Sequence, residues 1–197
     1  MAMHKSEELE KEAIRNAAAI MAASARTAPK AGGIDYIKTA IVDGDDILIL
    51  AAAMEQKAGE HVLPMSQAFA REAEILRKCS AVLLIGITGL PKIEIDCGAC
   101  GYKTCKELVE ARTSEGKDFS GPNCLHTTID LGVALGSAVK VASILNIDTR
   151  IQYTVGAAAK KLRLLDADMI IGVPLSVTGK NPYFDAMEAG MYQKGKM

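Results

Sequence analysis

Apolar side chains recur every three or four positions between residues 6 and 25, with acidic residues early and Arg15 further along. This spacing places the apolar positions on one face and predicts an amphipathic helix. Residues 28–33 contain Pro29 and two glycines, and they predict a loop because these residue types interrupt helices. Residues 81–87 form an unbroken apolar run, which is typical of a strand buried on both faces.

The rest of the chain alternates between extended and helical patterns. An acidic cap at Asp45 or Asp46 and a proline at position 64 mark the starts of two further helices. In chain order we expect a strand at 35–42, helices at about 46–57 and 64–78, the strand at 81–87, a long helix at 127–145, a short segment at 151–155, a helix near 157–164, a strand at 169–173 and an irregular tail from residue 176. No internal repeat is present, and the pattern predicts one α+β domain with the cysteine-rich segment as an insertion.

Composition narrows the functional classes. The chain has 197 residues, enough to bury a core, and its net charge of −1 and aromatic content of 4% provide neither the basic face nor the stacking platform that nucleic-acid binding needs. Charges run through residues 1–11, where a secretory signal needs an apolar core. The longest apolar stretch, 131–145, contains Lys140 and is shorter than a bilayer span. We therefore expect a cytoplasmic protein that binds neither nucleic acid nor membrane.

Four of the five cysteines lie between residues 97 and 124. In a reducing compartment, clustered cysteines are ligands or reactive thiols more often than disulfides. Their spacing is C-x2-C-x4-C-x18-C, so three thiols can wrap one side of a compact centre while the fourth returns from a distance. Iron–sulfur clusters are commonly held by four cysteines. The predicted ligands of a [4Fe–4S] cluster are Cys97, Cys100, Cys105 and Cys124.

The residues between these cysteines suit a tight wrap. Gly98 and Gly101 permit positive φ angles, and Thr104 can cap a helix that carries Cys105 in its first turn. His126 could donate a hydrogen bond to a cluster sulfur, although a surface or capping role is the simpler interpretation. A structural zinc ion is the alternative, because four thiolates also suit tetrahedral Zn²⁺. Zinc sites usually pair two short knuckles and this chain has one, so the pattern favours iron–sulfur. The lone Cys79 is expected to be a small buried apolar residue.

Residues 96–105, DCGACGYKTC, resemble the four-cysteine [4Fe–4S] domain of corrinoid iron–sulfur proteins and of B-type ferredoxin subunits of electron-transport complexes. The whole chain also resembles a family of anaerobe and archaeal proteins described as containing a ferredoxin domain. That resemblance includes residues 25–32, ARTAPKAG, and residues 174–182, PLSVTGKNP. The resemblance to the four-cysteine domain implies that all four thiolates bind one cluster.

Residues 25–32 are also similar to the nitroreductase loop that approaches bound FMN, in which the pattern is A-R-x-A-P-S-A-G-N. This resemblance implies a nitroreductase-like mixed sheet flanked by helices, formed by residues 1–88 and 126–197, with a cluster-binding insertion at 89–125. It further implies a homodimer built on the helix that contains Gly132 and Gly136, and FMN near Arg26, Lys30 and Gly32. The Arg-Ser-x-Arg segment that grips the FMN phosphate in nitroreductases is missing here, and Arg26 and Lys30 are the cations left to replace it.

Two classes of function are consistent with these patterns. The first is a redox protein in which the cluster passes single electrons to a partner, or to bound FMN in a flavin-linked oxidoreductase. The second is a non-enzymatic metal-binding module, either a cluster-based sensor or a zinc-stabilised interaction protein. The sequence leaves open whether the chain is an enzyme and which redox partner it serves.

Overall fold

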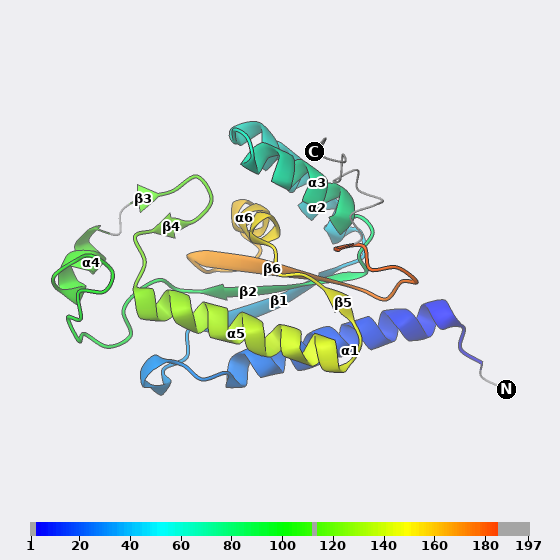
Figure 1. Ribbon diagram of the computed structural model, residues 1–197, viewed down its shortest axis with the longest axis horizontal. Helices are drawn as coiled ribbons and strands as arrows, with labels where there is room; N and C mark the ends of the chain where they lie inside the picture. Colours follow the sequence, from blue (N-terminus) through cyan, green and yellow to red (C-terminus); the bar gives the residue numbers. More distant parts are fainter. Residues whose placement is uncertain (1–2, 112–113, 185–197) are drawn as a thin grey trace, which may run out of the picture.

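The computed structural model describes residues 3–111 and 114–184. A central sheet separates two layers of helices (Figure 1). The elements in chain order are α1 (Ser6–Thr27), the 3-10 turn η1 (Ala31–Gly33), β1 (Ile37–Asp43), α2 (Asp46–Glu60), α3 (Met65–Leu76), β2 (Ala81–Ile87), α4 (Cys105–Ala111), β3 (Ser114–Glu115), β4 (Ser120–Gly121), α5 (Leu125–Ile144), β5 (Asp148–Thr149), α6 (Tyr153–Lys161) and β6 (Met169–Ser176).

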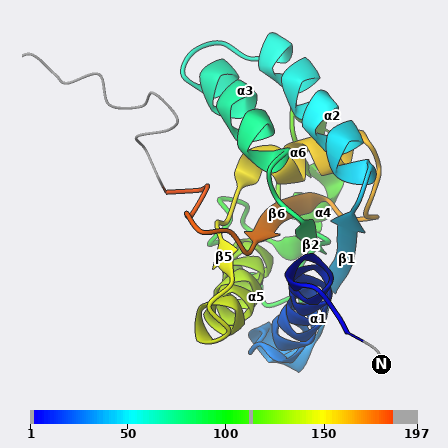
Figure 2. The same cartoon turned by 90° about the vertical axis from the view of Figure 1, so that its right-hand side faces the viewer.

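The sheet has the strand order β1-β2-β6-β5, and each of these neighbouring pairs is antiparallel. The α+β class with flanking helices is confirmed, but the described strand pairs are antiparallel where the sequence predicted a mixed sheet. The connection between β1 and β2 explains this. Helices α2 and α3 pack side by side as a helical pair (Figure 2). The chain therefore re-enters the sheet at the end where β1 finished, and Asp43 pairs with Ala81. A single crossover helix would have made the two strands parallel.

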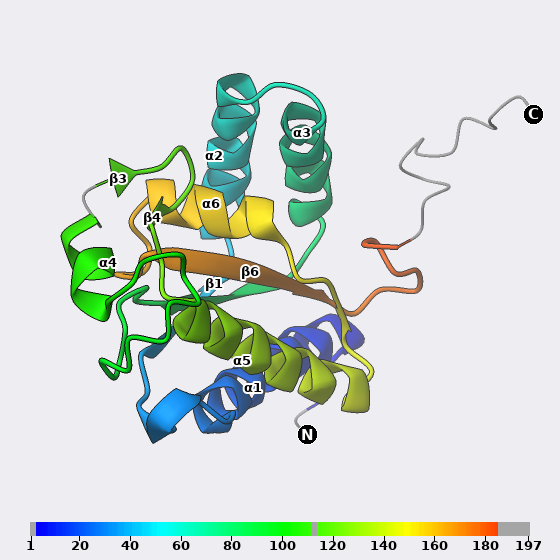
Figure 3. The same cartoon turned by 60° about the vertical axis from the view of Figure 1, so that its left-hand side comes forward.

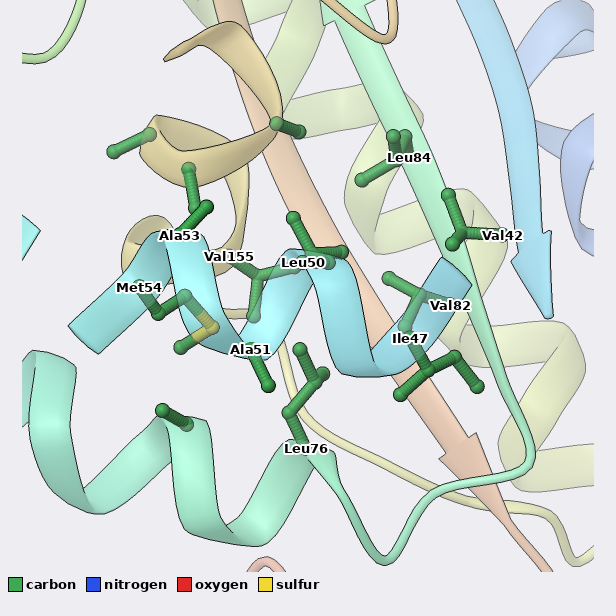
Figure 4. Close-up of a cluster of buried hydrophobic side chains, with 14 of the residues drawn as sticks. Val42, Ile47, Leu50, Ala51, Ala53, Met54, Leu76, Val82, Leu84 and Val155 are labelled. Atoms are coloured by element: carbon green, nitrogen blue, oxygen red, sulfur yellow. The ribbon is translucent and has the colours of Figure 1, made fainter. Parts of the chain in front are cut away.

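Strand β2 divides the core, because successive side chains of a strand point to opposite faces. Val82 and Leu84 pack in one cluster with residues of α2, α3 and α6. Figure 4 shows this cluster, with Leu50 of α2 facing the strand. The alternate residues of β2 pack against α1 and α5 on the other face. All seven residues of β2 are buried, which confirms the strand predicted at 81–87.

Helix α6 approaches β6 closely because both elements carry a glycine at the contact. A Cβ atom on Gly156 would lie 1.8 Å from the Ile170 carbonyl oxygen, and one on Gly172 would lie 2.2 Å from Val155 Cγ1. This helix begins at Tyr153, so it includes the last three of the five residues that we expected to form a separate segment at 151–155. Gln152, directly before the helix, pairs with Gly172 in an isolated bridge.

Helices α1 and α5 lie side by side beneath the sheet (Figure 3). A hydrogen bond from Ser24 Oγ to the Ser137 carbonyl oxygen, at 3.0 Å, joins them. Within the described residues, α5 is the one helix long and apolar enough to cross a membrane, a property that buried core helices share. It begins at Leu125 and is therefore longer than the apolar stretch considered above. Its inner face contributes Leu131 and Leu135 to the core.

Candidate metal centre

The cysteine segment leaves the core after β2 and returns at the start of α5, and hydrogen bonds join these two points. The Cys124 N–H donates to the Gly89 carbonyl oxygen at 2.8 Å, and Thr127 Oγ1 donates to the Leu90 carbonyl oxygen at 2.9 Å. The Gly89 N–H donates to Asp168 Oδ2, just before β6, at 2.7 Å. We call these contacts the neck. The limits 1–88, 89–125 and 126–197 remain predictions, and the neck lies at their edges.

The four clustered cysteines come from different parts of this segment. Cys97 and Cys100 lie in the loop before α4, Cys105 is the first residue of α4, and Cys124 directly precedes α5. Their exposure differs: Cys97 is exposed, Cys100 is half-buried, and Cys105 and Cys124 are buried. All four nevertheless line one cavity of about 120 Å³. We call it the cysteine cavity.

Local backbone geometry explains why the loop can turn so tightly. Gly98 and Gly101 have φ angles of 68° and 91°, which favour glycine, and the Gly101 N–H donates to the Gly98 carbonyl oxygen at 2.9 Å. Thr104 Oγ1 accepts the Glu107 N–H at 3.1 Å, which confirms the predicted cap of α4. Asp96 Oδ1 accepts the Cys105 N–H at 2.6 Å, so the side chain of Asp96 secures the start of α4.

The side chains that line the cysteine cavity do not form a site for a single metal ion. Within residues 3–111 and 114–184, no three His, Cys, Asp or Glu side chains converge as the ligands of a single ion would. A cluster makes a different demand, because its ligands surround several iron atoms. His126 also lines the cavity, and its Nε2 atom lies 3.7 Å from Cys97 Sγ.

The residues predicted to contact FMN are divided between two environments. Gly32, with a φ of 62°, lines the cysteine cavity. Arg26 donates to Asp35 Oδ2 at 2.5 Å and to the Ile37 carbonyl oxygen. Lys30 donates to the Arg26 and Ala28 carbonyl oxygens at 2.5 and 2.8 Å. Both cations thus bind acceptors of this chain: Arg26 binds Asp35 and the first residue of β1, and Lys30 binds carbonyl groups at the end of α1.

A polar cluster around the buried side chains of Lys57 and Asp118 attaches the cysteine segment to the core, and the sequence analysis missed it. Lys57 Nζ of α2 lies 2.7 Å from Asp118 Oδ1, His61 Nε2 lies 3.0 Å from the same oxygen, and the Tyr153 hydroxyl donates to Asp118 Oδ2 at 2.8 Å. Burial alone would raise the pKa of Asp118, but the hydrogen bonds from Lys57, His61 and Tyr153 lower it below its ordinary value. The signal in the sequence is Lys57 itself, which follows Leu50 and Met54 on the inward face of α2.

Comparisons with known proteins show the family to which the chain belongs. Residues 120–186 match a family model described as "Uncharacterized protein containing a ferredoxin domain", and residues 90–121 match one described as "Putative Fe-S cluster". An uncharacterized protein of Archaeoglobus fulgidus is 51% identical over 174 residues, which cover 88% of this chain and 92% of that protein.

Solved structures resemble the core. The crystal structure of a nitroreductase with bound FMN from Desulfitobacterium hafniense DCB-2 has a TM-score of 0.53 at 12% identity, covering 91% of this chain and 81% of that one. A BluB-like flavoprotein from Clostridium difficile 630 has a TM-score of 0.51 at 14% identity, covering 81% and 78%. At such identities the likeness shows the fold. The chain belongs to the family of proteins described as containing a ferredoxin domain, and its core has the nitroreductase-like fold.

Proposed function

We propose that this protein transfers single electrons through a [4Fe–4S] cluster bound by Cys97, Cys100, Cys105 and Cys124. One observation carries the proposal: four thiols separated by up to 27 positions along the chain (124 − 97) line the same cavity. Thiolates are the usual protein ligands of iron–sulfur clusters. The family descriptions of a ferredoxin domain and an iron–sulfur cluster support the same centre.

The surroundings of the cavity suit an electron carrier. A bound cluster supplies reversible one-electron chemistry, with one electron accepted from a reduced donor protein and one given to an oxidised acceptor. Cys105 and Cys124 lie on the buried side of the cysteine cavity, where the fold excludes water, whereas Cys97 is exposed. A redox partner can therefore approach at Cys97, beside the exposed apolar residues Ile93 and Ile95.

Flavin-linked oxidoreductase activity is the second candidate. It is favoured by the position of Gly32, which belongs to the loop that resembles the FMN loop and also lines the cysteine cavity. A flavin at this loop would lie next to the cluster and could exchange electrons with it. The phosphate of FMN needs cationic partners. To bind it, Arg26 and Lys30 would have to release their present acceptors, which are Asp35 and backbone carbonyl groups.

We also propose a homodimer formed through the outer face of α5. Leu125, Ile129 and Val133 are exposed on this face at a spacing of four residues, together with Gly132 and Gly136. Small residues at such positions allow close helix packing, and exposed apolar stripes mark interfaces. Sedimentation velocity tests this proposal: Val133→Arg should yield monomers if α5 forms the interface, and a monomeric wild-type protein would contradict it.

Anaerobic purification tests the proposed centre. We expect about four iron and four sulfide per chain, broad visible absorption that bleaches on reduction, and an electron paramagnetic resonance signal of the reduced cluster. Cys124→Ser should remove or convert the cluster, whereas the control Cys79→Ser should retain it. A colourless protein with one zinc per chain would refute the redox function and support the zinc-stabilised module. A cluster retained in Cys124→Ser but lost in Cys79→Ser would refute the ligand assignment.

Titration of the anaerobic protein with FMN tests the second candidate. Saturable quenching of flavin fluorescence, lost in Gly32→Val, would support flavin binding beside the cluster. An added side chain at Gly32 would place its Cβ 2.3 Å from Ile93 Cδ1 and obstruct the loop. Absence of binding at micromolar FMN would leave the electron carrier as the function.

A further inference from the structure

A buried ion pair lies beside the cysteine cavity. Lys92 is in the cysteine segment, and its Nζ lies 2.6 Å from Asp130 Oδ2 of α5; the two side chains are 3% and 6% exposed. The same ammonium donates to the Ile34 carbonyl oxygen at 2.6 Å and lies 5.4 Å from the centroid of the Tyr36 ring. Each partner is therefore held in place by the fold.

The pair has a defined direction relative to the cavity. Lys92 lines the cysteine cavity, whereas Asp130 does not. The second carboxylate oxygen, Asp130 Oδ1, accepts the Ala31 N–H at 3.0 Å, which fixes the orientation of the carboxylate. Lys92 therefore belongs to the same cavity lining as the four cysteines, whereas its acidic partner does not.

Stability alone does not account for such a pair. Removing two charges from water is costly, and replacing a buried pair with apolar residues of similar volume is often neutral or stabilising. A charge at a redox site has another effect, because the low dielectric of the interior strengthens its interaction with the charge of the centre. Reduction of a bound cluster would add one negative charge to the cavity, which a cation in the cavity lining would stabilise more than a carboxylate outside the lining would destabilise.

We propose that the Lys92–Asp130 pair tunes the reduction potential of the cluster: Lys92 raises the potential by favouring the reduced state, and Asp130 partly offsets this effect. The inference rests on the proposed function, since it requires a cluster in the cysteine cavity. It assigns opposite effects to the two halves of one ion pair. A purely structural pair would produce no such opposition.

Redox titration of the cluster, followed by absorbance and electron paramagnetic resonance, tests this inference. Lys92→Met should favour the oxidised cluster roughly tenfold, a decrease of about 59 mV for a one-electron couple. Asp130→Asn should shift the potential in the opposite direction, because it leaves the cation unbalanced. Lys92→Arg keeps the charge and should stay close to the wild-type potential.

A single variant leaves one buried charge unpaired and can misfold for that reason alone. The double variant Lys92→Met/Asp130→Leu leaves no unpaired charge. We expect a folded protein with a potential below that of the wild type. Lys57→Met/Asp118→Leu is the matched control: this pair has an N–O distance of 2.7 Å and side chains 3% and 8% exposed, but neither residue lines the cysteine cavity. Its removal should leave the potential unchanged.

Equal potentials in wild type and both single variants, or shifts in the same direction, would overturn the inference. Failure of the double Lys92/Asp130 variant to fold would also overturn it, because the pair would then serve structure. These outcomes differ from failure of the proposed function, which would appear as a wild-type protein without iron.

Discussion

The core and the cysteine segment lie next to each other but are held together differently. In the core, β2 is buried along its whole length and β6 along most of it, between two apolar clusters. In the described part of the cysteine segment, the buried apolar side chains are Cys105, Leu108 and Cys124, and two of these three are proposed ligands. The segment therefore has almost no apolar core apart from its thiols.

This difference indicates what each region needs in order to fold. Apolar burial stabilises the core by about 25 cal/mol per Å², with no contribution from a cofactor. The cysteine segment depends on the neck, on the polar cluster at Asp118 and, in our proposal, on its metal centre. Metal binding that orders its own ligands contributes directly to folding. The following predictions test this contrast, beginning with the largest expected effect.

Removal of the metal centre should disorder one region and spare the other. Treating the anaerobic protein with a chelator and an oxidant should accelerate amide hydrogen exchange in residues 90–121 by orders of magnitude, because the four thiols would no longer be cross-linked. Exchange in β2 and β6 should change little. Equal protection of the segment with and without iron would show that it folds by itself.

Truncation of an apolar side chain should destabilise the core more than the cysteine segment. Leu84→Ala removes a fully buried side chain from β2 and should lower the free energy of unfolding by about 3–4 kcal/mol. Ile95→Ala in the cysteine segment, where the side chain is 54% exposed, should change it by less than about 0.5 kcal/mol. Urea denaturation measures both variants. A comparable loss in Ile95→Ala would contradict the contrast between the regions.

The polar cluster should matter to both regions, since it connects them. Lys57→Met leaves the buried Asp118 carboxylate without its ammonium partner and should cost about 3 kcal/mol. Lys57→Met/Asp118→Leu should restore part of that loss, because no charge is left unpaired. Thermal unfolding of the two variants gives the comparison, and a double variant less stable than the single one would indicate that apolar packing cannot replace this contact.

The reactivity of the fifth cysteine, Cys79, should depend on pH as expected for a buried thiol. Burial raises the pKa of Cys79 from 9.0 to about 12, so at pH 8 its thiolate is about a thousandfold rarer than that of an ordinary thiol. In the folded protein, alkylation of Cys79 by iodoacetamide should be slow at pH 8 and should keep rising with pH beyond 9. Mass spectrometry of peptides after metal removal should show the other four cysteines labelled first.

The local features of the fold could be predicted from the sequence. Spacing of apolar residues located α1, β2 and the long helix α5, and the cysteine spacing gathered the four thiols that line one cavity. Thr104 was predicted as a cap because that interaction spans three residues. Short-range geometry is sufficient for each of these features.

Contacts between distant residues could not be predicted in the same way. Lys57 meets Asp118 only after α2 has packed on the sheet, and Lys92 meets Asp130 only after α5 has done so. The antiparallel pairing of β1 with β2 depends on α2 and α3 acting together as a helical pair. Single-residue patterns carry little information about such arrangements, since each residue type also suits a solvated surface.

The neck has a consequence for the engineering of this chain. Gly89 and Cys124 are joined by one hydrogen bond of 2.8 Å, so the thirty-odd residues between them begin and end at nearly the same place. A segment with adjacent ends can be excised and replaced by a short turn without moving β2 or α5. Grafting the segment into a loop of another scaffold would in addition require counterparts of Lys57, His61 and Tyr153, because these core residues bind Asp118 of the segment.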